Sequence, residues 1–170
     1  MLALRIPAAL AFALALGATP AGAVTILLTA SLDGLQETPP VATPGTGTAS
    51  LSYDTDLNKL IWSGSFRDLI GTTTMAHFHG PAAPGTPAGI RVGITIPIGV
   101  TAGSFGLSSA TISEALEAEL LAGLCYLNIH TTFRPGGEIR GQVTVVPEPG
   151  TLALGALGIA LLGLARRRAA

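Results

Sequence analysis

Short runs of alternating apolar and polar residues fill the middle of the chain, with turn residues between them at intervals of about ten. Alternation with a period of two is typical of strands that bury one face. The runs predict strands at 26–32, 46–53, 59–66, 72–79, 90–96, 126–132 and 138–145. Segments rich in Pro, at 39–45 and 80–89, predict loops.

One segment has helical rather than strand periodicity. Residues 111–114 fit a capping box with Thr111 as the N-cap, and Leu116, Leu120 and Leu121 follow at helical spacing up to Gly123. Strands greatly outnumber this helix. The predicted fold class is therefore mainly β, an antiparallel Ig-like β-sandwich with one short helix.

The first 23 residues resemble a signal peptide rather than part of the fold. Arg5 gives a positive start, residues 8–17 are apolar, and Ala21 and Ala23 form a small-x-small cleavage motif. We expect signal peptidase to cleave after Ala23. The domain is then expected to occupy residues 24–146.

The C-terminal tail, residues 147–170, has the pattern of a hydrophobic helix followed by positive charge. Residues 151–165 carry no charge, and Arg166, Arg167 and Arg168 follow. Fifteen helical residues span about 22 Å, which is short of a hydrocarbon core of about 30 Å. The tail is therefore expected to be a marginal transmembrane helix, with the arginines on the inner side.

The tail resembles the PEP-CTERM sorting signal of Gram-negative bacteria through Pro147, Glu148 and Pro149, the apolar run and the terminal arginines. The resemblance implies recognition by an exosortase-type protease near residues 147–149. It also implies export, to the periplasmic face of the inner membrane, the cell surface or the extracellular matrix.

Composition narrows the function of the predicted domain. Residues 24–146 contain five basic and nine acidic residues, which gives no reason to expect nucleic-acid binding. Cys125 is the only cysteine, so no internal disulfide can form, and its apolar neighbours favour burial. No nucleophile elbow, P-loop or dinucleotide fingerprint occurs, and the domain is not expected to be an enzyme.

All three histidines lie in two predicted strands. Alternation puts His77 and His79 on one face of the first strand, and His130 on the face of its own strand that also carries Asn128. If the two strands are neighbours, the three imidazoles converge and suit one copper or zinc ion. Glu138 and Arg140 also alternate outward and are expected, with Asn128, to surround the ligands.

A structural role for the same histidines is the alternative. His79 precedes Gly80 and Pro81 and could cap its strand by hydrogen bonding to loop backbone, while His130 could hold the turn at residues 134–137. The sequence leaves both interpretations open.

Four ordered segments, 35–41, 76–82, 120–131 and 135–142, resemble the CHRD domain, named for chordin. The resemblance implies an extracellular β-sandwich with no established reaction, and its histidine positions correspond to His77, His79 and His130. The strand with two histidines plus a distant third is also similar to copper/zinc superoxide dismutase, but three histidines are too few for two metals.

Two functions follow as expectations. The first is an exported binding or structural module for an extracellular polysaccharide or a surface protein. The second is a mononuclear copper or zinc protein that uses His77, His79 and His130.

Overall fold

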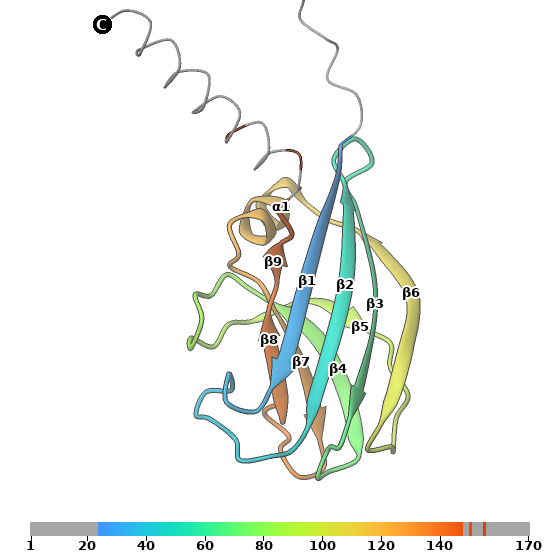
Figure 1. Ribbon diagram of the computed structural model, residues 1–170, viewed down its shortest axis with the longest axis vertical. Helices are drawn as coiled ribbons and strands as arrows, with labels where there is room; N and C mark the ends of the chain where they lie inside the picture. Colours follow the sequence, from blue (N-terminus) through green and yellow to red (C-terminus); the bar gives the residue numbers. More distant parts are fainter. Residues whose placement is uncertain (1–23, 148–149, 151–154, 156–170) are drawn as a thin grey trace, which may run out of the picture.

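The computed structural model describes residues 24–147, 150 and 155, which form nine strands and one helix (Figure 1). The signal peptide and most of the C-terminal tail lie outside the described residues. The elements are β1 (Thr25–Asp33), β2 (Thr46–Asp54), β3 (Lys59–Arg67), β4 (Thr73–His79), β5 (Ile90–Ile94), β6 (Gly103–Thr111), α1 (Glu114–Leu121), β7 (Tyr126–Thr131), β8 (Ile139–Gln142) and β9 (Thr144–Val145).

The strands form one antiparallel sheet in the order β5-β4-β7-β8-β1-β2-β3-β6, and β9 pairs with β1. The sheet folds over on itself. This is evident from Trp62 of β3, which packs edge-on against Phe78 of β4 with ring centroids 5.3 Å apart. Those two strands are not neighbours in the sheet. The mainly β, antiparallel, sandwich-like expectation is therefore confirmed, with a nearly barrel-like closure (Figure 1).

The core lies between the two halves of this folded sheet. Alternate residues of β1, β2 and β3 are buried, as in β2, where Ala49, Leu51 and Tyr53 point inward. β7 differs, since all six of its residues are buried. One of its faces therefore packs on the core, and loops cover the other.

Two details of the expected elements are corrected, and a third is confirmed. β6 is an additional strand at the sheet edge, which the sequence pattern did not reveal. The expected last strand is split into β8 and β9. Cys125 is buried in the hydrophobic core, as expected.

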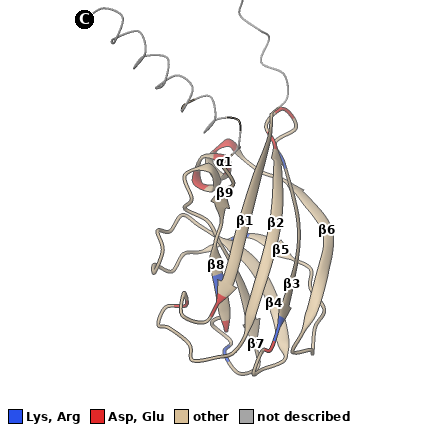
Figure 2. Cartoon of the chain, in the orientation of Figure 1, with Lys and Arg blue, Asp and Glu red and all other residues tan. Residues whose placement is uncertain are grey.

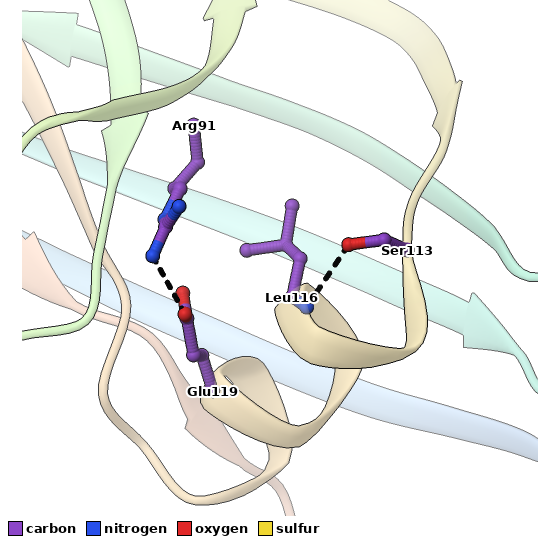
Figure 3. Close-up of polar contacts among 4 residues, drawn as sticks. All are labelled: Arg91, Ser113, Leu116 and Glu119. Atoms are coloured by element: carbon purple, nitrogen blue, oxygen red, sulfur yellow. Dashed lines mark hydrogen bonds and ion pairs between the residues drawn. The ribbon is translucent and has the colours of Figure 1, made fainter.

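The prediction that Thr111 caps the helix is wrong. Thr111 ends β6 and pairs with Lys59, so its backbone belongs to the sheet. Ser113 is the N-cap, and its Oγ accepts a hydrogen bond from the Leu116 N–H at 3.3 Å (Figure 3). An ion pair of 2.6 Å between Arg91 and Glu119 ties α1 to β5 (Figure 3).

Charged residues are sparse over the domain, and basic and acidic positions are interspersed (Figure 2). Within residues 24–147, 150 and 155, no helix has the length and apolar character needed to cross a membrane. The expected transmembrane helix at 151–165 falls almost wholly on residues that are not described.

Candidate metal centre

The strands that carry the three histidines are direct neighbours. β4 pairs antiparallel with β7, and the register sets His77 opposite Asn128 and His79 opposite Tyr126. Ala76 and Phe78 alternate with the histidines of β4 and are buried in the core. The imidazoles therefore lie on the face of the sheet that points away from the core, as the alternation predicted.

The three imidazoles meet at one place. One ring nitrogen from each of His77, His79 and His130 lies within 4.8 Å of the other two. The shortest approach is 3.2 Å, between His77 Nδ1 and His130 Nε2. Nitrogens bound to one tetrahedral ion at 2.0–2.1 Å would be about 3.3 Å apart. We call these residues the three-histidine cluster.

Two of the rings are oriented by backbone carbonyls on their outer side. His79 Nδ1 lies 2.9 Å from the Ala88 oxygen, and His130 Nδ1 lies 2.8 Å from the Pro135 oxygen. A carbonyl only accepts, so each Nδ1 carries the proton and each Nε2 keeps a lone pair. His79 and His130 therefore do make the structural hydrogen bonds to loop backbone. The same bonds orient the two rings so that their Nε2 atoms face the cluster.

The electrostatics favour the neutral form of His77 and His79, which is the form that binds metals. Burial, followed by the nearby imidazoles of His130 and His79, lowers the pKa of His77. Burial also lowers the pKa of His79, and the hydrogen bond to Ala88 only partly opposes this. His79 Nε2 is buried and has no hydrogen-bond partner among the residues that the structure describes.

Tyr126 is a site residue that the sequence reasoning missed. Its ring stacks on the His79 imidazole at 4.9 Å, nearly parallel, and the Arg140 guanidinium lies 4.3 Å from its ring centre. The Tyr126 hydroxyl accepts a hydrogen bond from the Ala88 N–H, and Arg140 donates to the Thr86 carbonyl. This stack holds the loop that in turn orients His79. The sequence did contain a signal for it, since alternation along the strand places Tyr126 on the same face as His130.

Arg140 and Asn128 lie beside the three-histidine cluster. The register forms a row across three strands, from His77 through Asn128 to Arg140. Asn128 Oδ1 and Arg140 Nη2 are buried, and neither has a hydrogen-bond partner in the described part of the chain. They therefore border the site without bonding to an imidazole.

Glu37 is a second residue that the sequence did not single out. It is buried, and its Oε1 is another atom with no partner within the described ranges. Burial raises its pKa to about 7, while the Arg140 charge acts in the opposite direction. The loop before β2 therefore brings a carboxyl that is half protonated near neutral pH next to Arg140.

Glu138 does not face outward, and that expectation is wrong. Its side chain is fully buried. Its oxygens accept hydrogen bonds from the hydroxyls of Thr43 and Thr131 and from the N–H groups of Ile70 and Gly71, at 2.6–3.0 Å. Burial raises its pKa, but these four bonds outweigh that effect and lower it overall. Glu138 thus joins three segments of the fold, and none of these bonds is to a histidine.

Most of the expected processing residues cannot be placed. Pro147 is described, as the residue that follows the sheet. The cleavage residues Ala21 and Ala23 and the sorting residues Glu148, Pro149, Arg166, Arg167 and Arg168 lie outside the described residues.

Comparisons with known proteins agree with both resemblances. Residues 28–143 match the family model of the CHRD domain, and residues 145–169 match that of the PEP-CTERM protein-sorting motif. The search of solved structures gave no match. The first match spans more than half of the chain and contains the three-histidine cluster.

Proposed function

The chain belongs to the CHRD domain family, and we propose that its domain is a mononuclear metal-binding module with copper or zinc at the three-histidine cluster. The observation that supports this most directly is the approach of three ring nitrogens to within 4.8 Å of one another. Three imidazoles with a fourth, open position are a common ligand set for these ions. The carbonyl anchors of His79 and His130 supply the outer hydrogen bonds that metal-bound histidines usually have.

The sorting motif and the CHRD domain together make this an exported protein that is sorted by exosortase. We place the domain outside the cytoplasm, at the periplasmic face of the inner membrane, the cell surface or the extracellular matrix. The metal site would then work where metal ions come from the surroundings of the cell.

We propose no reaction for the domain. The other expected role, binding of a polysaccharide or a surface protein, has no particular side chains to support it. The metal role has three named ligands, two oriented rings and a buried nitrogen that lacks a partner among the described residues. We therefore favour the metal-binding function.

Metal analysis of the full chain, purified without an affinity His-tag, tests the proposal. We expect close to one copper or zinc ion per chain after loading and removal of loosely bound metal. His77→Ala should lose that ion, whereas Thr74→Val, an isosteric change at an exposed neighbour on the same strand, should keep it. Wild-type protein that takes up neither ion, or His77→Ala protein that keeps it, would refute the proposal.

A further inference from the structure

Met75 occupies a position on β4 with the same strand parity as His77 and His79. It lies two residues before His77, and the register sets it directly opposite His130. A register shift between Thr73 and Met75 puts an extra residue in β4 just before it. Such β-bulges often redirect side chains next to functional sites. Met75 therefore shares the sheet face of the three-histidine cluster.

The spacing is compatible with ligation. Directly opposed residues of antiparallel strands have Cα atoms about 4.5–5.5 Å apart, and residues two apart on one strand lie about 6.5–7 Å apart. A methionine side chain has three rotatable bonds and a polarisable sulfur at its third heavy atom. A thioether at this position can reach an ion held by His77 and His130.

The charge around the cluster favours an ion of low charge. Three neutral imidazoles bring no negative charge, and no carboxylate or thiolate belongs to the cluster within the described residues. The nearest charged side chain in the stack is the Arg140 guanidinium, separated from His79 by Tyr126. A partly buried site without negative charge accommodates a monovalent ion at lower electrostatic cost than a divalent one.

We propose that Met75 supplies a thioether ligand to the three-histidine cluster and that the resident ion is Cu(I). This rests on the proposed metal-binding function and specifies its ion. Thioether sulfur is a soft ligand that selects Cu(I), whereas Zn(II) is satisfied by imidazole and water. Met75 is 48% exposed, so the residue is accessible to an ion from the surrounding solvent.

The test compares Cu(I) and Zn(II) binding by the full chain and by Met75→Leu, which keeps the apolar volume but lacks sulfur. Cu(I) affinity is measured anaerobically by competition with a chromogenic Cu(I) chelator, and Zn(II) affinity with a zinc dye. We expect Met75→Leu to weaken Cu(I) binding by about tenfold, equivalent to ~1.4 kcal/mol, and to leave Zn(II) binding unchanged. Thr74→Val is the matched control and should change neither affinity.

X-ray absorption identifies the ligand independently of affinity. The chain has two methionines, Met1 and Met75. A Cu–S scattering path in the wild type that disappears in Met75→Leu, and becomes Cu–Se in selenomethionine protein, supports the proposal. Cu(I) bound by nitrogens alone, or equal losses of Cu(I) and Zn(II) affinity in Met75→Leu, would overturn it and leave the metal-binding function standing. Failure of the wild type to bind either ion would instead overturn the proposed function.

Discussion

His77 Nδ1 and His130 Nε2 lie 3.2 Å apart although 53 residues separate them in the chain. At this distance only one of the two nitrogens can carry a proton, which then forms a hydrogen bond to the other. The same distance also suits two nitrogen ligands of one metal ion. Their surroundings differ, because His130 is anchored to the Pro135 carbonyl on its other side. In the described part of the chain, the only hydrogen bond of the His77 imidazole is the one with His130.

This difference predicts unequal costs for two substitutions in the metal-free protein. His130→Ala removes the hydrogen bond to the Pro135 carbonyl and should lower the free energy of unfolding by about 1 kcal/mol. His77→Ala breaks no hydrogen bond to a backbone carbonyl and should lower the free energy of unfolding by less. Urea denaturation with a chelator present measures both. Equal losses would show that the carbonyl anchor does not hold the turn at residues 134–137.

Glu37 gives a prediction about pH. The folded carboxyl keeps its proton up to about pH 7, whereas the unfolded one releases it near its usual value of 4.5. The raised pKa therefore stabilises the fold as pH falls between these values, and ionisation of the buried group destabilises it as pH rises. Glu37→Gln removes this dependence, so the variant should gain stability relative to wild type from about pH 5 to about pH 8.

Denaturation of both proteins across that range measures the difference. The histidines of lowered pKa favour the fold at higher pH, because unfolded histidines take up protons below 6.5 while these do not. Their contribution is common to both proteins and cancels in the comparison. A stability difference that does not change with pH would contradict the raised pKa.

Glu138→Ala should be among the most damaging single substitutions in the domain. It leaves the N–H groups of Ile70 and Gly71 and the hydroxyls of Thr43 and Thr131 without their acceptor. Several unsatisfied buried groups predict a loss of about 3–5 kcal/mol in the free energy of unfolding. Asp56→Ala, at an exposed turn position, is the control. A loss near that of the control would show that these contacts add little.

Adjacent glycines provide a matched pair at the edge of the site. Gly137 has φ +132°, and an added Cβ would overlap the Asn128 amide and lie 2.6 Å from Glu37 Oε1. Gly136 has open space around it. Gly137→Ala should therefore destabilise the domain by about 1–3 kcal/mol and weaken metal binding, whereas Gly136→Ala should change stability by about 0.5 kcal/mol at most. Thermal melts and metal titration of both variants measure the contrast, and similar behaviour of the two would contradict it.

The sequence predicted the histidine cluster because its geometry follows from strand parity. His77 and His79 are two residues apart, and their strand proved to be the neighbour of the strand with His130. Alternation also places Tyr126 and Met75 on the face that carries the histidines. It does not show which of these side chains stack on a histidine or bind a metal ion.

Other features were missed for identifiable physical reasons. β6 has few apolar residues because it lies at the sheet edge, so its alternation is weak. The role of Glu138 depends on partners from residues 43, 70–71 and 131, whose proximity only the folded chain establishes. The capping box at Thr111 failed because pairing with Lys59 extended the strand to the helix start.

The single buried cysteine described above leaves the domain without a covalent cross-link between distant segments. An ion held by His77 and His130 would tie β4 to β7 and close a loop of 53 residues. An ion that binds the folded site but not the unfolded chain stabilises the folded state, and more so as the free ion concentration rises above its Kd. The stability of the exported domain would then depend on metal occupancy, a dependence that a chelator would reverse and a permanent disulfide would lack.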